Sequence, residues 1–149
     1  MNINYKIDQK DLRLLKKKIK SLKDYSGQTL SSEIGKTAFA IENRSKRKVP
    51  VAKKFGGGLK QSIKTFHSGK KAFVEAGKKY APFVEFGTGS KVDLTDMKAL
   101  GIPESYAKQF KGKGIRDINL PARPFLFPSA RTEFLNLLKR ITDKLKKLT

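Results

Sequence analysis

The stretch YAPFVEFGTG, residues 80–89, places one glutamate among three aromatic residues and ends on two glycines that flank a threonine. A carboxylate in an apolar run is costly to bury unless it is hydrogen-bonded or paired. The many basic side chains of this chain could pair with Glu85, and backbone N–H groups near Gly87 and Thr88 lie within its local reach. We therefore interpret Glu85 as a buried polar residue that orients the aromatic segment. The competing interpretation, a catalytic acid, lacks a second group to work with.

Length and composition favour one domain, residues 1–149, with a single core, since 38% of the residues are hydrophobic. The absence of cysteine excludes disulfides, cysteine-based zinc sites and thiol nucleophiles. The N-terminus lacks the apolar segment of a signal peptide, and no apolar run approaches the roughly 18 residues of a membrane helix. We expect a protein made in the cytoplasm that contacts no membrane.

The charge is strongly basic, with 34 Lys and Arg against 13 Asp and Glu, a formal net charge of +21. Such a field favours a polyanion or an acidic protein surface as neighbour. Most of the basic residues are lysine, however, whereas arginine is preferred for fixed phosphate contacts. Non-specific proximity to DNA is therefore the stronger expectation, and specific nucleic-acid recognition the weaker one.

Two helices are predicted in the first third of the chain. Residues 8–23, within a basic N-terminal segment 1–24, carry an apolar stripe that we expect to face the core, with the lysines solvated. A membrane-surface helix would look similar, but the apolar side has no Trp or Phe, which favours a stripe that faces the core. After a break at 24–28, a second helix is predicted over 29–48, ending near Val49 because Pro50 disfavours helix before it. The inward residues of the two helices are Leu12, Leu15, Ile19 and Leu22, then Leu30, Ile34, Ala38 and Ile41.

The middle of the chain predicts a β-hairpin followed by an insertion. Residues 59–67 and 71–76 alternate in polarity around the turn residues Ser68 and Gly69. Residues 88–120 are polar and glycine-containing, and we expect a mobile insertion that could hold short helices at 93–100 and 103–110.

The C-terminal part predicts an extended piece, residues 120–127, and then the most regular helix of the chain, opened by Pro128. Its apolar residues recur every three or four positions and form a stripe over five turns. The stripe consists of Ala130, Phe134, Leu137, Ile141, Leu145 and Leu148.

Catalytic and metal-binding patterns are weak throughout. His67 is the lone histidine and is expected to be a surface or half-buried strand residue. Asp93, Asp96 and Glu104 match no calcium-loop spacing. Glu75 and Glu85 could form a glycosidase pair only with aromatic sugar platforms, and the chain has no Trp. We expect neither enzymatic activity nor a cofactor or metal.

Three motifs in order, at 49–63, 79–89 and 120–130, resemble the tail-completion, or head–tail joining, family of minor tail components in long-tailed bacteriophages. The first follows a long helix with Pro, Gly, Leu and a Ser-Ile pair, the second is similar to a Tyr-Ala-x-x-Val-Glu-Phe-Gly-Thr signature, and the third to Pro-x-x-Pro-Phe-Leu-x-Pro-Ala. The matching residues are Pro50, Gly58, Leu59, Ser62 and Ile63, then Tyr80, Ala81, Val84, Glu85, Phe86, Gly87 and Thr88, then Pro121, Pro124, Phe125, Leu126, Pro128 and Ala130.

The resemblance implies an α+β fold, a small and mainly antiparallel sheet packed against a long helix of the N-terminal half and a C-terminal helix, with the N-terminal helix as an extra element. Glu85 and the RPFLFP strand (123–128) would hold this shape. It also implies a structural virion protein at the head–tail junction, made in the bacterial host cytoplasm.

The partners implied are other neck and tail proteins, namely the connector, stopper, tail terminator or tail tube, and further copies of the chain in a ring around the DNA channel. Two alternatives stay open: a basic nucleic-acid-binding protein and a tail-terminator ring component. The residues of the insertion that we expect to contact partners are Lys91, Lys98, Lys111, Lys113 and Arg116.

Overall fold

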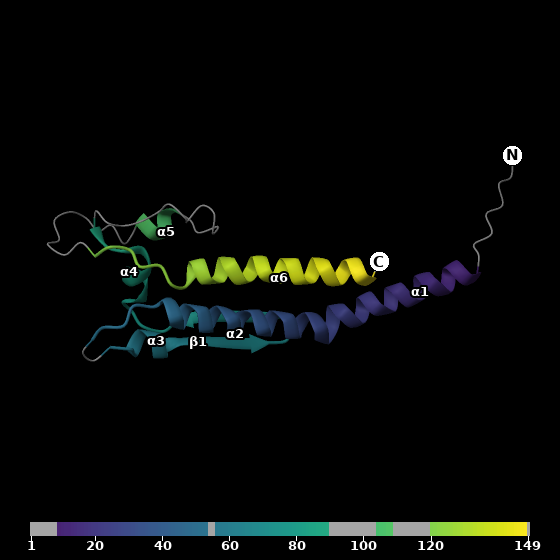
Figure 1. Ribbon diagram of the computed structural model, residues 1–149, viewed down its shortest axis with the longest axis horizontal. Helices are drawn as coiled ribbons and strands as arrows, with labels where there is room; N and C mark the ends of the chain where they lie inside the picture. Colours follow the sequence, from purple (N-terminus) through teal and green to yellow (C-terminus); the bar gives the residue numbers. More distant parts are fainter. Residues whose placement is uncertain (1–8, 54–55, 90–103, 109–119, 149) are drawn as a thin grey trace.

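A computed structural model describes residues 9–53, 56–89, 104–108 and 120–148, and has the α+β fold expected. Figure 1 shows an elongated molecule in which two long helices lie next to each other and a β-hairpin packs against one of them. The elements are α1 (Gln9–Asp24), a short π-helical turn η1 (Tyr25–Thr29), α2 (Leu30–Lys48), α3 (Gly58–Ser62), β1 (Ile63–Ser68), β2 (Lys71–Ala76), α4 (Ala81–Phe86), α5 (Glu104–Lys108) and α6 (Phe127–Leu148).

The predicted hairpin is confirmed. Strands β1 and β2 pair antiparallel, with Ile63 opposite Ala76 and Ser68 opposite Lys71. Ala72, Val74 and Ala76 are half-buried, whereas Phe73 and Glu75 face solvent, as the alternation indicated. α2 packs against both strands.

The predicted start of the first strand is wrong, because residues 59–62 belong to the helical turn α3. The turn is closed by the Gln61 N–H, which donates to the Gly57 carbonyl at 2.9 Å, and by the Ser62 hydroxyl, which donates to the Leu59 carbonyl at 2.8 Å. Gly57 opens the turn with φ of 100°, a value that glycine adopts without strain. The strand begins only after these local bonds end, at Ile63.

The predicted break at 24–28 is confirmed as a kink at Gly27, where two helices meet. The chain stays wound through η1, and only Gly27 leaves helical geometry, with φ of −84° and ψ of −110°. The Leu30 N–H bonds to the carbonyls of Gly27 and Tyr25, so the turn remains hydrogen-bonded across the kink. One residue without a Cβ therefore changes the direction of the chain between the two helices.

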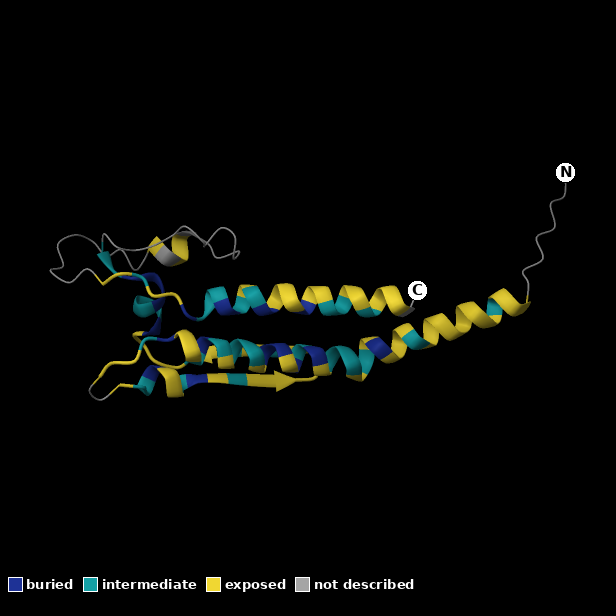
Figure 2. Ribbon diagram, viewed as in Figure 1, coloured by how far each residue is buried: buried dark blue, intermediate teal, exposed yellow. Residues whose placement is uncertain are grey.

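The expectation that the apolar stripe of the first helix faces a core is also wrong. No residue of α1 is buried, and Leu15 and Ile19 are 54% and 56% exposed. The reason is geometric: beyond the kink, most of α1 extends past the C-terminal end of α6 (Figures 1 and 2). The stripe therefore lies on the surface.

α6 begins at Phe127 with Pro128 in its first turn, as predicted. The preceding residues, 120–126, form neither helix nor strand, so the RPFLFP segment is not the strand that we expected. Along the predicted apolar stripe Leu137 is buried, but Phe134 is 55% exposed and Leu145 is 37% exposed. The side of α6 that meets α2 instead buries Ser129 and Glu133.

The predicted insertion, 88–120, lies largely outside the described residues, including the helix expected at 93–100. Within it, α5 (Glu104–Lys108) confirms a short helix in the second expected place. The side chain of Leu148 is also outside the described part.

The apolar core sits at one end of the long helices. It consists of Val49, Leu59, Ile63, Ala81 and Phe125, and Ile63 and Phe125 are 0% and 1% exposed. Segments from three distant parts of the sequence therefore meet at this point.

Candidate functional site

Glu85 lies on α4, a helix of six residues that forms between two local signals. Pro82 sits in its first turn, where the fixed φ of proline favours a helix start. The Tyr80 carbonyl accepts hydrogen bonds from the N–H groups of Phe83 and Val84, and Gly87 ends the helix with φ of 77°. This short helix turns the Glu85 side chain inward, where the residue is only 4% exposed.

The Glu85 carboxylate caps the N-terminus of α6. Its Oε2 atom accepts hydrogen bonds from the N–H groups of Phe125 at 2.8 Å and Leu126 at 2.9 Å, and its Oε1 atom accepts one from Phe127 at 2.9 Å. The first N–H groups of a helix have no partner within the helix, and its dipole places partial positive charge there. A carboxylate can accept hydrogen bonds from such N–H groups, and its negative charge is favoured at the positive end of the dipole. We call Glu85 and these three N–H groups the carboxylate clamp.

Glu85 is therefore a buried polar residue that orients its segment, as predicted, but its partners were predicted wrongly. The N–H groups expected to hold it were those near Gly87 and Thr88. Thr88 instead bonds to Leu120 twice: its N–H donates to the Leu120 carbonyl at 2.9 Å, and its hydroxyl oxygen accepts the Leu120 N–H at 2.8 Å. The Arg123 N–H donates to the Val84 carbonyl at 2.8 Å. The segments around 80–89 and 120–128 are thus joined along their length.

Each of the three sequence motifs contributes to the core beside the clamp. Leu59 and Ile63 come from the first motif, Ala81 from the second and Phe125 from the third. Phe86 adds a ring contact, its centroid 5.5 Å from that of Phe127. The three motifs therefore meet in one packed cluster. Their apolar residues form its core, and Glu85 joins α4 to residues 125–127 beside it.

Other predicted motif residues lie outside this core. Pro50 follows the end of α2, Gly58 is the first residue of α3 after its N-cap Gly57, and the Tyr80 side chain is 48% exposed. Pro124 is exposed and Pro128 half-buried. The predicted partner contacts lie outside the described residues; they are Lys91, Lys98, Lys111, Lys113 and Arg116.

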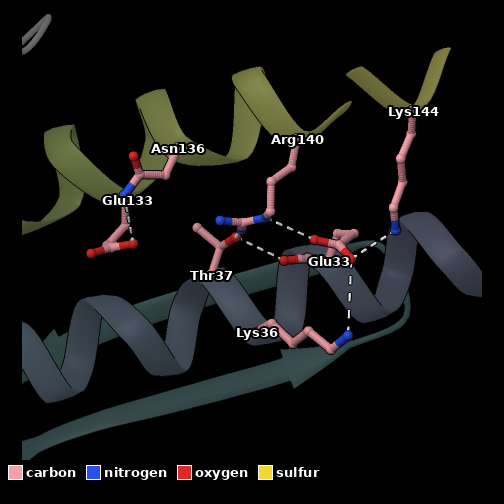
Figure 3. Close-up of polar contacts among 7 residues, drawn as sticks. All are labelled: Glu33, Lys36, Thr37, Glu133, Asn136, Arg140 and Lys144. Carbon is pink, nitrogen blue, oxygen red and sulfur yellow. Dashed lines mark hydrogen bonds and ion pairs between the residues drawn. The ribbon is translucent and has the colours of Figure 1, made fainter. Parts of the chain in front are cut away.

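Sequence reasoning missed a second polar cluster, between α2 and α6 (Figure 3). Glu33 of α2 is 6% exposed and accepts hydrogen bonds from Arg140 Nε at 2.9 Å and Lys144 Nζ at 3.0 Å. The Arg140 guanidinium also donates to the Thr37 hydroxyl at 2.7 Å, and the Lys36 ammonium lies 3.9 Å from Glu33. We call this the Glu33 network.

Glu133 extends the same interface from the opposite helix. It is 7% exposed and accepts hydrogen bonds from Arg44 Nε of α2 at 2.7 Å and from the Asn136 amide at 3.2 Å. Each long helix thus provides one buried glutamate and receives cations from the other. The two helices are held in register by complementary charge as well as by apolar contact.

Hydrogen bonds and neighbouring cations lower the pKa of both glutamates. The hydrogen bond from Lys144 is the largest cause that lowers the pKa of Glu33; burial opposes it, and the Arg140 hydrogen bond adds to it. For Glu133 burial is the largest single cause and raises the pKa. The hydrogen bonds from Asn136 and Arg44 together with the Arg44 and Arg140 charges outweigh burial, so the pKa is lowered.

A signal for this network was present in the sequence. Glu133, Leu137, Arg140 and Lys144 are spaced by four, three and four positions, so they share one face of α6. That face overlaps the predicted apolar stripe at Leu137 and otherwise lies to one side of it. Glu33 lies in the same way among the inward residues of α2.

The predicted catalytic candidates do not form a site in the described part of the chain. His67 is exposed on β1, which confirms a surface strand position, and its Nε2 atom lies 3.5 Å from the Ser31 hydroxyl. Among the described residues, no three His, Cys, Asp or Glu side chains gather closely enough to hold a metal ion. No helix within the described ranges is long and apolar enough to span a bilayer.

Comparisons of the chain with protein-family models, with curated proteins and with solved structures found no match. The resemblance of the three motifs to the tail-completion family stays a prediction.

Proposed function

We propose that this chain is a structural virion protein of a tailed bacteriophage that acts in tail completion and head–tail joining. The observation that carries the proposal is the carboxylate clamp, where the motif segments 49–63, 80–89 and 120–130 meet. Both oxygens of the Glu85 carboxylate accept backbone hydrogen bonds, which supports an architectural use of this acid. In a family that shares these motifs, the motif residues would maintain the fold.

The shape and charge of the molecule also support an assembly role. The described part is long and narrow, with an exposed helix at one end and the clamp near the other (Figure 1). The net charge of +21 suits a position beside packaged DNA or an acidic connector surface. In the proposed setting the neighbours are the connector, stopper, tail terminator or tail tube, and the chain occurs in several copies as a ring.

The test is a phage in which the gene for this chain carries a stop codon. We expect DNA-filled heads and complete but separate tails by electron microscopy, and joined particles when the wild-type chain is supplied from a plasmid. An antibody against the chain should label the head–tail junction of complete particles. Joined, infectious particles made without the chain, or label found elsewhere on the virion, would contradict the proposal.

The predicted partner contacts can be tested in the same complementation assay. Replacing Lys91, Lys98, Lys111, Lys113 and Arg116 with Gln should block joining while leaving the urea-unfolding midpoint of the purified chain unchanged. Normal joining by this variant would show that these five residues have no docking role.

A second candidate, a basic nucleic-acid-binding protein, is favoured by one observation, the row of exposed lysines on α1. It requires binding to duplex DNA whose affinity falls with salt at a slope of about 0.9 per phosphate neutralised. No retardation of duplex DNA at low salt would exclude it. A tail-terminator role differs from tail completion only in the position that the antibody labels.

A further inference from the structure

The exposed stripe of α1 is an apolar surface on a helix that projects from the folded body. Leu15 and Ile19 are more than half exposed, Leu22 is 37% exposed and Leu12 half-buried. At about 100° per residue these four side chains share one side of the helix. Figure 2 shows α1 exposed along nearly all of its length. Such a stripe on a projecting helix suits contact with another molecule.

The borders of this stripe are mainly basic. The same helical geometry places Lys16 and Lys23 beside Leu12 on one border, and Lys18 beside Leu22 on the other, where Asp11 is the one acidic residue. The opposite side of the helix carries Arg13, Lys17 and Lys20. A partner must therefore offer apolar surface in the middle and negative charge along both edges.

A second copy of the chain does not offer this combination. Two α1 helices packed by their stripes would bring lysine borders together, which opposes association. The chain also has an apolar groove of about 750 Å³ between β2 and α6, lined by residues that include Ala72, Val74 and Phe134. Lys70 and Lys71 border that groove, so it too would repel the lysines of α1.

Nucleic acid and lipid fit less well than protein. Duplex DNA would engage the lysines through its phosphates but would leave the leucine and isoleucine side chains exposed to water. Helices that lie in a membrane surface carry Trp, Phe or Leu on the apolar side, and the α1 stripe has aliphatic residues but no aromatic anchor for the headgroup region. An acidic protein groove satisfies both the stripe and its borders.

We infer that α1 is a docking helix that inserts its Leu12–Leu22 stripe into an apolar groove bordered by Asp and Glu on a different protein. This is helix-in-groove recognition, with the leucine and isoleucine residues as anchors and the lysines providing orientation and fast association. The inference rests on the proposed function only in treating the partner as another part of the assembly. The surface itself can be tested with the isolated chain.

The experiment measures binding of the full chain to a fluorescently labelled acidic peptide by anisotropy. The probe is a three-heptad helix with Leu at its a and d positions and Glu at its e and g positions. Two control peptides replace all of the Leu or all of the Glu with Gln. We expect the probe to bind at least about tenfold more tightly than either control at about 50 mM salt, and less tightly at about 500 mM salt.

Three double-substitution variants of the chain distinguish binding through the stripe and its borders from binding through net charge. Leu15→Gln with Ile19→Gln removes the anchors and should weaken probe binding about tenfold or more. Lys16→Gln with Lys23→Gln removes one charged border and should weaken it about threefold or more at low salt. Lys17→Gln with Lys20→Gln removes the same charge from the opposite side of the helix and should change the affinity for the probe by less than about twofold. Because α1 has no buried residue, all three should keep the wild-type unfolding midpoint.

Several results would overturn the inference. Equal binding of the all-Gln-for-Leu peptide, or equal losses from the two lysine pairs, would show attraction by net charge alone. The inference also fails if the Leu15→Gln/Ile19→Gln variant loses dimerisation in sedimentation, retardation of duplex DNA, or binding to phosphatidylserine vesicles that the wild-type chain shows. Each of these losses would identify a different occupant of the stripe. The junction assay above does not depend on these measurements, so failure of the inference and failure of the proposed function are distinguishable.

Discussion

Two buried glutamates, 4% and 6% exposed, hold this molecule together in different ways. Glu85 is held by three backbone N–H groups, that of Phe127 at the start of α6 and those of the two residues before it. Glu33 is held by the side chains of Arg140 and Lys144, which are themselves 40% and 43% exposed. The two glutamates are thus buried to nearly the same extent, but the donors of Glu85 are backbone groups and those of Glu33 are side chains.

The difference lies in what must be ordered to make each site. The N–H donors of the clamp are fixed by the backbone and carry no titrating charge of their own. The donors of the Glu33 network are long side chains that lose rotamer freedom on binding and stay partly in water, where salt screens them. We therefore expect the clamp to determine whether the chain folds, and the Glu33 network to adjust the strength and register of the α2–α6 contact.

The largest effect is expected from Glu85→Gln. The amide keeps the shape but turns an N–H₂ group toward one of the three backbone donors, so at least one buried N–H loses its acceptor. The free energy of unfolding should fall by about 3 kcal/mol, measured by urea denaturation.

The matched control is Glu75→Gln on the exposed face of β2, which should change the same free energy by about 0.5 kcal/mol or less. A Glu85→Gln chain as stable as this control would show that the three hydrogen bonds contribute little, and the architectural interpretation of Glu85 would fail.

A smaller effect is expected from Glu33→Gln, about 1–2 kcal/mol at low salt, because its partners are partly solvated. The loss should shrink when salt is raised to about 500 mM, whereas the loss from Glu85→Gln should persist. Urea denaturation of both variants at two salt concentrations measures this contrast. Equal salt dependence of the two losses would remove the distinction between the sites.

Acid should act on the Glu33 network in a defined direction. Because the folded pKa of Glu33 lies below its ordinary value of 4.5, the unfolded chain binds more protons in the interval between the two values. The stabilisation is complete above pH 4.5 and is lost as pH falls through the folded pKa. Glu33→Gln should therefore unfold with a shallower pH dependence than wild type below about pH 4.5. Parallel pH profiles of the two chains would contradict the assignment.

Local patterns in the sequence predicted the elements well where the pattern and the packing agree. The period of two in residues 71–76 gave β2, Pro50 gave the end of α2, and Pro128 gave the start of α6. The burial of Glu85 among aromatic residues was also predictable, because a lone acid in an apolar run requires a fixed partner. These predictions need only neighbours in the chain.

Pairings across the chain could not be predicted in this way. The donors of the clamp lie 40–42 positions from Glu85, and Arg140 lies 107 positions from Glu33. The stripe of α6 was located but the face that meets α2 lies to one side of it, on Glu133 and Arg140. The stripe of α1 has an apolar period as regular as a core helix, but the kink at Gly27 directs it away from the body. Periodicity shows that a face is apolar; only the fold shows what covers it.

The smallest effects come from two fully buried serines, and they extend the comparison to neutral groups. Ser129, in the first turn of α6, donates its hydroxyl to the Phe125 carbonyl at 2.6 Å, whereas the Ser45 hydroxyl in α2 has no hydrogen-bond partner. Ser129→Ala removes a hydrogen bond next to the clamp and should lower the free energy of unfolding by about 1 kcal/mol. Ser45→Ala removes an unsatisfied polar group and should leave stability unchanged or raise it by up to about 1 kcal/mol. The two substitutions delete the same atom at equal burial, so a difference in sign measured by urea denaturation isolates the hydrogen bond. Equal losses would mean that Ser45 finds a partner in solution.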